Sequence, residues 1–201
     1  MESNPFTSSE FIVFTTRHYA VARDLSLSAA SHQLKTMEKK KWFQPVTRGI
    51  WANPSHPYFT PMACVPVLLG VEQGYVSFLT ALHRHQAISQ IPRSIQIATT
   101  GHSRRLKTSF SDFEFFQLKP EMMLHGVEWS NTHIPFRMAT PEKALLDTLY
   151  MATRKGKRFA SLPQLQEGFR KNKFRLLLED QVQSVRIRAA IMTQLERYKL
   201  R

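Results

Sequence analysis

With 201 residues, 42% apolar and 21% charged, the chain can form one ordinary domain or two small ones. This composition argues against low-complexity, collagen-like and wholly disordered chains. No apolar run approaches the length of a membrane span, the N-terminus lacks a secretory signal pattern, and a lone cysteine excludes disulfide scaffolds and multi-cysteine zinc sites. We therefore expect a cytoplasmic protein that makes no contact with a membrane.

The chain is strongly basic, with 28 lysines and arginines against 15 acidic residues. The excess is concentrated in residues 154–201, which hold 13 basic and four acidic side chains. Clustered basic charge binds polyanions because neutralising phosphates releases counterions. Nucleic acid is therefore the first partner to consider, and the alternative is a basic chain whose charge serves only solubility.

Two short helices are predicted near the N-terminus, over about 16–23 and 27–40, joined by a turn at 24–26. Thr16 is expected to cap the first helix, and Ser26 or Ser28 the second. Spacings of three and four residues place an apolar stripe on the inner face of the second helix: Leu27, Ala30, Leu34 and Met37.

The outer face of the second predicted helix is polar and basic. Its candidate DNA contacts are Ser28, Ala29, Ser31, His32 and Lys35, and the start of the first helix adds Thr16 and Arg17. A recognition helix presents such residues to base edges, with small side chains permitting close approach to the groove. The alternative is an ordinary amphipathic helix with a solvated face.

Two short strands are expected next, over 42–46 and 50–52, around the turn Thr47-Arg48-Gly49. Helix, turn, helix and hairpin in this order outline a winged helix, whose wing contacts the DNA backbone or minor groove. Thr47 and Arg48 are thus candidate contacts, and Arg48 is the strongest of them. The alternative for Arg48 is an exposed turn residue.

A domain boundary is predicted in the proline-rich segment 54–61, because residues that precede proline favour extended chain. We expect a DNA-binding domain over 1–53, a hinge over 54–61 and a second domain over 62–201. No repeat with a period of 20–50 residues is present, which argues against a solenoid.

The second domain is expected to be α+β. Helices are predicted over 62–69 and 77–86, with breaks at Gly70 and Gly74, and period-two segments predict a small antiparallel sheet from 95–98, 113–118, 127–129 and 134–138. Thr140-Pro141-Glu142 is a helix start, with a threonine cap and a proline at the first position. The predicted fold is thus an N-terminal winged helix-turn-helix followed by a mixed α/β domain.

Further basic segments could add phosphate contacts. The segment 101–107 offers Arg104 and Arg105 between two predicted strands, and the end of the helix after Thr140 offers Lys155, Lys157 and Arg158. The segments 170–175 and 186–188 lie on helical patterns and form a basic tail. In each case a solvated charged surface is the alternative.

No catalytic, metal or cofactor site is predicted. His83 and His85 are two apart on a predicted helix and face different directions, and Cys64 lies in an apolar run typical of a buried thiol. Gly70 and Gly74 match no nucleotide-binding loop, and Glu142 and Asp147 do not form a carboxylate pair directed at one atom. The chain is therefore expected not to be an enzyme.

Two segments resemble the AbiEi family of type IV antitoxins and related bacterial transcriptional regulators. The first is TTRHYAVARDLSLSAASHQLKTMEKKKWFQPVTRGIWAN, and the more specific second is THIPFRMATPEKALLDTLY, whose PEKALLD is similar to the family's C-terminal domain. The resemblance extends over nearly the whole chain. One departure is Lys41, which stands where winged helices often place a glycine after the recognition helix.

The resemblance implies a repressor that binds inverted repeats in the promoter of its own operon, as a monomer or weak homodimer. It also implies a nucleotidyltransferase-like toxin, countered without a stable complex. Two alternatives are a standalone winged-helix regulator with no toxin and an RNA-binding or interaction protein.

Overall fold

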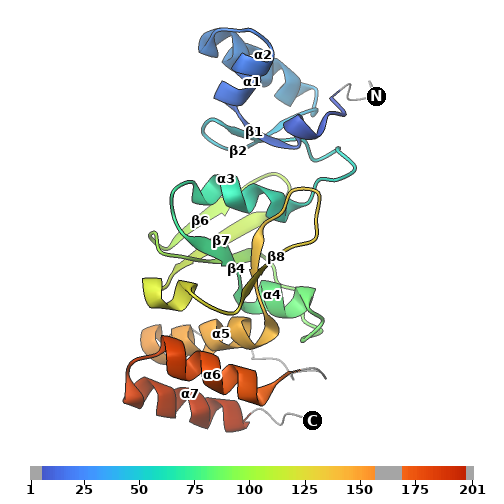
Figure 1. Ribbon diagram of the computed structural model, residues 1–201. Helices are drawn as coiled ribbons and strands as arrows, with labels where there is room; N and C mark the ends of the chain where they lie inside the picture. The colour runs from blue at the N-terminus through green and yellow to red at the C-terminus, as the bar shows by residue number, and fades with distance from the viewer. Residues whose placement is uncertain (1–5, 157–168, 198–201) are drawn as a thin grey trace. The chain divides into compact units, whose positions relative to one another are not determined.

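The computed structural model describes residues 6–156 and 169–197 (Figure 1). The chain divides into two compact units. The first comprises Met1–Gly70, Leu106–Asp112 and Asn131–Phe136, and the second comprises the remainder. The segment 54–61 therefore lies within the first unit. It is tied to the chain's beginning, because the buried Asn53 donates from Nδ2 to the Phe6 carbonyl at 3.0 Å, and His56 Nε2 lies 3.0 Å from the Thr7 carbonyl.

The first unit contains a three-stranded antiparallel sheet and, within its described residues, three α-helices and two short 3-10 helices. In chain order its elements are η1 (Ser9–Phe11), β1 (Val13–Thr15), α1 (Thr16–Ala22), α2 (Leu27–Lys39), β2 (Gln44–Thr47), β3 (Ile50–Ala52), η2 (Pro61–Cys64) and α3 (Val65–Leu69). The strand order is β1-β3-β2, so the strand before the helices pairs with the last strand of the hairpin. Both predicted helices and the hairpin are confirmed, with ends within one or two residues.

Aromatic rings fill the core beneath α1 and α2. Phe11, Phe14, Tyr19 and Phe43 are buried, and their ring centroids lie 4.8–6.4 Å apart. Ala30 and Leu34 of α2 are fully buried against them, as the spacing predicts. The prediction for Leu27 is wrong, since this side chain is 52% exposed. Leu27 begins α2, and because helical side chains tilt toward the N-terminus, it extends beyond the core.

The second residue after helix α2, Lys41, adopts a left-handed backbone conformation. Winged helices often place a glycine at this position. Lys41 has φ +61°, its N–H bonds to the Glu38 carbonyl at 2.9 Å, and the Trp42 N–H bonds to the Met37 carbonyl at 3.0 Å. A lysine in this conformation costs about 1 kcal/mol relative to glycine. The C-terminal cap of α2 therefore forms although its left-handed residue is a lysine and not a glycine.

Most of a six-stranded mixed sheet belongs to the second unit, and Leu106, Lys107 and Asp112 of its strands belong to the first. The strand order is β6-β7-β5-β4-β9-β8, with β4 (Gly74–Val76), β5 (Ile95–Thr99), β6 (Arg104–Lys107), β7 (Asp112–Gln117), β8 (Val127–Trp129) and β9 (Arg137–Ala139). The pairs β5–β7 and β4–β9 are parallel, while β4–β5 and β8–β9 are antiparallel. The expected small antiparallel sheet is thus wrong. Strand β4 occupies a predicted break, and β6 occupies part of a predicted loop.

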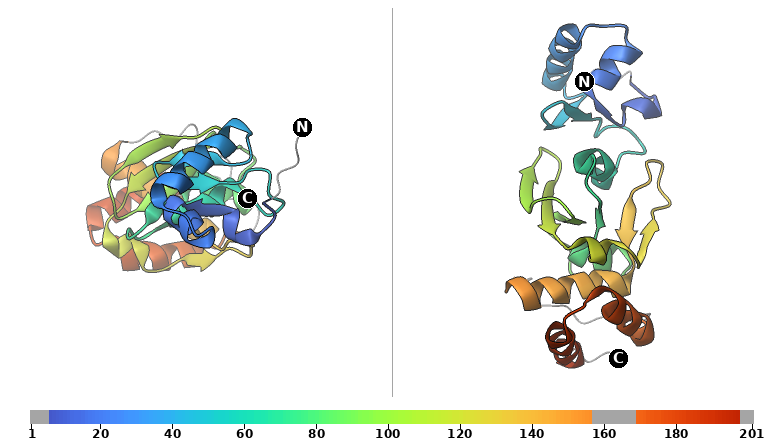
Figure 2. Two further views of the ribbon diagram at one scale, coloured as in Figure 1. Left: turned by 90° about the horizontal axis from the view of Figure 1, so that it is seen from above. Right: turned by 60° about the vertical axis from the view of Figure 1, so that its left-hand side comes forward.

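Five helical elements accompany this sheet: α4 (Phe78–Arg84), η3 (Pro120–Met123), α5 (Pro141–Lys155), α6 (Lys171–Gln181) and α7 (Val185–Arg197). Helix α5 is central, packing against α4, α6 and α7 (Figures 1 and 2). It starts as predicted, since Thr140 Oγ1 accepts from the Lys143 N–H and Pro141 takes the first position. In the described parts of the chain, no helix combines the length and apolarity needed to cross a bilayer.

Candidate nucleic-acid interface

The two helices of the first unit are held by a short, well-bonded turn. Asp24 adopts φ +50°, and the Leu25 N–H then bonds to the Ala20 carbonyl at 2.9 Å, which reverses the chain after α1. The hydroxyl of Ser26 accepts from the Ala29 N–H at 3.2 Å and caps α2, which was one of two predicted caps. The turn therefore fixes where the first residues of α2 lie.

The predicted outer face of α2 is largely open to solvent. Ser28, His32 and Lys35 are exposed, whereas Ala29 and Ser31 are half-buried. The Ser31 hydroxyl donates to the Leu27 carbonyl at 2.8 Å, so its proton is already used within the helix. Ser28, His32 and Lys35 are three and four residues apart and thus form one stripe. Ligands of this stripe would meet hydrogen-bond donors and positive charge.

Sequence reasoning missed a fourth member of the stripe, Lys39. It follows Lys35 by four residues, is exposed, and is the basic residue in the last turn of α2. The helical spacing that selected His32 and Lys35 also reaches Lys39. The missed signal was therefore present in the sequence.

The hairpin turn is bonded directly to the start of α1. Thr47 pairs with Ile50, leaving Arg48 and Gly49 as the two loop residues, and Gly49 has φ +77°, which glycine adopts without strain. The Thr16 N–H donates to the Gly49 carbonyl at 2.9 Å. The turn and the first residues of α1 therefore lie side by side.

This contact brings four predicted residues together: Thr16, Arg17, Thr47 and Arg48. Arg17, Thr47 and Arg48 are exposed. Thr16 does not cap α1 as expected, because the preceding Thr15 accepts from the His18 N–H at 3.0 Å. The Thr16 hydroxyl instead accepts from Trp51 Nε1 at 3.0 Å, which anchors β3 to α1. Two exposed arginines thus lie next to a hydrogen-bonded junction.

Other cations of the first unit stack on aromatic rings. The Arg23 guanidinium carbon lies 5.0 Å from the centroid of Phe6 and 5.6 Å from that of Phe11. Lys40 Nζ lies 4.6 Å from the centroid of Trp42. Such cation–π contacts are worth about 0.5–1 kcal/mol at exposed sites. Arg23 and Lys40 remain exposed, as do Arg17, the stripe of α2 and the hairpin turn.

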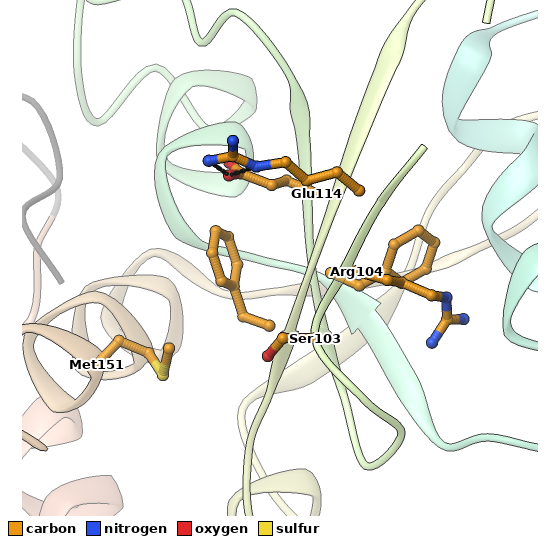
Figure 3. Close-up of a pocket in the computed structure, with 7 residues that line it drawn as sticks. Ser103, Arg104, Glu114 and Met151 are labelled. Atoms are coloured by element: carbon orange, nitrogen blue, oxygen red, sulfur yellow. Dashed lines mark hydrogen bonds and ion pairs between the residues drawn. The ribbon is translucent and has the colours of Figure 1, made fainter. Parts of the chain in front are cut away.

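Arg104 and Arg105 of the second unit both contact carboxylates. Arg104 NH1 donates to both oxygens of Glu72, at 3.1 and 2.9 Å, and its guanidinium carbon lies 4.1 Å from the Phe115 centroid. Arg105 Nε donates to Glu114 Oε1 at 2.8 Å. Both arginines also line a shallow pocket of about 330 Å³, where Arg104 points away from Glu114 (Figure 3). A phosphate at either arginine has to compete with a carboxylate already in place.

The basic segment after α5 is only partly within the described chain. Lys155 is the last residue of α5, and Gly156 follows it with φ +60°. Lys157 and Arg158 lie outside the described residues. Arg154 donates from NH1 to the Tyr150 hydroxyl at 2.7 Å.

A buried polar cluster in the second unit was also missed. Lys143 Nζ contacts Asp147 Oδ1 one turn along α5, and both side chains are fully buried. Tyr75 and Ser77 donate their hydroxyls to Asp147 Oδ2 at 3.0 and 2.7 Å. Burial lowers the pKa of Lys143 and raises the pKa of Asp147, and the attraction between the two opposes both shifts. Neither side chain of the pair reaches solvent, and Asp147 links α5 to Tyr75 and Ser77.

Cys64 has the environment of an inert thiol. It is fully buried, and burial raises the pKa of the Cys64 thiol to about 12. Within residues 6–156 and 169–197, no three histidine, cysteine or acidic side chains gather as metal ligands would.

In comparisons with known proteins, no family model and no curated protein sequence matched the chain.

Proposed function

We propose that this protein is a sequence-specific DNA-binding transcriptional repressor whose first unit is a winged helix-turn-helix. The observation that carries the proposal is the bonded junction of the first unit. It places the Arg48-Gly49 turn beside the start of α1 while the stripe Ser28, His32, Lys35 and Lys39 stays exposed.

The topology of the first unit supports this proposal. A strand leads into two helices joined by a short turn, and a hairpin follows whose last strand pairs with the first strand. In a winged helix the second helix of the pair enters the major groove, and the hairpin contacts the flanking backbone. Helix α2 is the recognition helix in this reading, and the hairpin turn is the wing tip.

The exposed side chains of the first unit could contact two different parts of DNA, the base edges and the phosphates. His32 and Lys35 can donate to base edges in the major groove, while Arg17 and Arg48 can contact phosphates on either side. Ser28 and Ala29 are small enough to let α2 approach the groove floor. Lys155, at the end of α5, would add a backbone contact.

The wider role follows from the resemblance to AbiEi antitoxins. We assign the protein to a type IV toxin–antitoxin system in the cytoplasm, where it represses its own operon through inverted repeats. It would counter a nucleotidyltransferase-like toxin without forming a stable complex, and would itself be neither an enzyme nor a cofactor-binding protein. The support is the quoted segments, above all PEKALLD.

A binding titration tests the DNA-binding role. Fluorescence anisotropy with the duplex upstream of the gene, a scrambled duplex and single-stranded RNA of equal length should show tightest binding to the upstream duplex. We expect a discrimination of about 10³ or more over scrambled DNA. Equal affinity for all three would contradict sequence-specific repression, and a preference for RNA would favour the RNA-binding alternative.

Co-expression tests the antitoxin role separately. If the neighbouring gene encodes a toxin, its growth arrest should be relieved by this protein, and also by a variant whose DNA binding is abolished. A growth arrest that persists beside the intact protein would leave a standalone regulator as the better description.

A further inference from the structure

Helix α6 presents an outward face that is apolar at its centre and oppositely charged at its two ends. The inward residues Phe174, Leu177, Leu178 and Gln181 are buried, which sets the orientation of the helix. Leu176 is 67% exposed and is the middle residue of Lys171–Gln181. Covering this side chain with another surface would remove apolar area from water and would be favourable.

Charges are arranged in order along this face. Residues three and four apart on a helix share a face, so Lys173, Leu176 and Asp180 form one stripe. Arg175 and Glu179 flank that stripe, and both are exposed. The half of the helix before Leu176 is therefore cationic, and the half after it is anionic.

The loop that precedes β8 contacts the end of α6 and carries an exposed leucine. His125 Nε2 lies 3.8 Å from Asp180 Oδ2, and Gln181 Nε2 donates to the His125 carbonyl at 3.0 Å. Leu124, the residue before His125, is 65% exposed. We call Lys173, Arg175, Leu176, Glu179 and Asp180 the α6 surface. Its exposed leucine, Leu176, is bordered by charges of both signs.

We propose that the α6 surface is a homodimer interface in which α6 of one copy packs antiparallel against α6 of a second copy. A two-fold axis through Leu176 places the residues before it in one copy beside the residues after it in the other. Lys173 then lies within about one residue rise, ~1.5 Å, of Asp180 of the second copy along the axis, and Arg175 within ~3 Å of Glu179. Both pairs are attractive and both recur by symmetry.

A second copy is the occupant that this charge order favours. A two-fold interface uses the same patch on both partners, so it must be complementary to itself. A cationic half and an anionic half on either side of an apolar centre satisfy that condition. A uniformly acidic or basic partner would be attracted by one half and repelled by the other.

The size of the surface predicts a weak dimer. An 11-residue helix is about 16 Å long. A contact of this length falls below the roughly 800 Å² per partner of a stable complex, so we expect a Kd on the order of 10–100 µM. The inference deepens the proposed function, on which its purpose rests, because inverted repeats are read by two-fold related copies. Binding to two half-sites would hold the copies together at lower concentrations.

Charge reversal at Arg175 and Glu179 provides the test. This pair is chosen because Lys173 Nζ already lies 3.6 Å from Glu142 Oε2 within the same copy. Sedimentation velocity of the full chain without DNA, from about 5 to about 500 µM, should show concentration-dependent dimerisation of the wild type. Arg175→Glu sets two acidic side chains against each other across the interface, and Glu179→Arg sets two basic ones, so each variant alone should weaken the dimer at least about tenfold.

An equimolar mixture of the two variants should dimerise again. Each mixed dimer holds one copy with two acidic side chains at these positions and one copy with two basic side chains. Both contacts across the two-fold axis are then attractive, as they are in the wild type. A variant that was merely unfolded would not be rescued in this way.

Controls separate dimerisation from folding and from DNA binding. Arg84→Glu on α4 makes the same charge change as Arg175→Glu and should dimerise like the wild type, and circular dichroism should show unchanged helix content in every variant. A wild type that stays monomeric at about 500 µM, single variants that dimerise normally, or folded variants that fail to associate when mixed would each overturn the interface. Binding to a duplex with one half-site is measured in parallel and should be unaffected. If the wild type failed to bind this duplex, the DNA-binding role would be refuted, and the dimer interface would not.

Discussion

The two units place the same kinds of side chain in different environments. In the first unit Arg17, Lys35 and Arg48 are exposed on a helix face and a hairpin turn. In the second unit Arg104 and Arg105 contact Glu72 and Glu114, and Lys143 is buried against Asp147. The net charge of a chain counts all these cations alike. The structure indicates that those of the first unit are open to a ligand, whereas these cations of the second unit already hold parts of the fold together.

Removing the buried lysine should have the largest effect. Lys143→Met leaves the Asp147 carboxylate buried without its cation, and breaking a buried pair in this way costs about 3–5 kcal/mol. We expect the free energy of unfolding of the second unit to fall by that amount in a urea titration followed by circular dichroism. Met approximates the volume of the lysine stem, so the loss would reflect charge and not a cavity.

Lys119→Met is the matched control for this substitution. Lys119 is exposed, and its replacement should change the free energy of unfolding by less than about 0.5 kcal/mol. If Lys143→Met were equally harmless, the buried lysine would not be needed for the fold, and the contrast between the units would lose its clearest case.

Removing the wing-tip arginine should affect binding and leave folding unchanged. Arg48 is exposed beside the junction with α1, and a single phosphate contact accounts for about one unit of the salt slope. Arg48→Ala should weaken binding to the upstream duplex roughly tenfold and reduce the slope of log K against log salt by about 0.9. An unchanged slope would place Arg48 away from the backbone.

The face of α2 should control discrimination more than affinity. Combining Ser31→Ala with His32→Ala removes two polar groups from the proposed groove-facing helix, although the Ser31 proton is held by the Leu27 carbonyl. We expect the ratio of affinities for upstream and scrambled DNA to fall about fivefold, with scrambled-DNA affinity unchanged. Equal losses on both duplexes would mean that this face contacts only the backbone.

Local signals were sufficient to predict α1, α2 and the hairpin of the first unit and the start of α5, whereas β1 and its pairing with β3 were not predicted. Ser26 before α2, Gly49 in a two-residue hairpin loop and Thr140-Pro141 before α5 act on neighbouring residues, so each could be read from a few positions. The inner stripe of α2 was predicted at Ala30 and Leu34 and failed only at Leu27, where the helix begins and the core ends.

Contacts between residues far apart in the sequence could not be predicted from such local signals. The parallel register of β5 and β7 joins Ile95 to Phe113, and nothing in either segment selects parallel over antiparallel pairing. Arg104 meets Glu72 from 32 residues away, so a basic segment that looks free in the sequence is neutralised in the fold. Lys143 and Asp147, in contrast, are four apart on one helix, and that pair could have been predicted.

The substitution Arg105→Ala should have the smallest effect of those proposed. Arg105 is also the residue that compares most directly with Arg48. Its side chain is 76% exposed, as a phosphate-binding residue requires, yet its guanidinium bonds Glu114. An exposed pair of this kind contributes about 0–1 kcal/mol to stability, so Arg105→Ala should leave the protein folded. Because a phosphate has to displace the carboxylate, we expect DNA affinity to change less than about twofold and the salt slope to stay the same. The same anisotropy titration measures both substitutions. A tenfold loss for Arg105→Ala would show that a paired arginine binds DNA as well as an exposed one, and the distinction drawn between the two units would then fail.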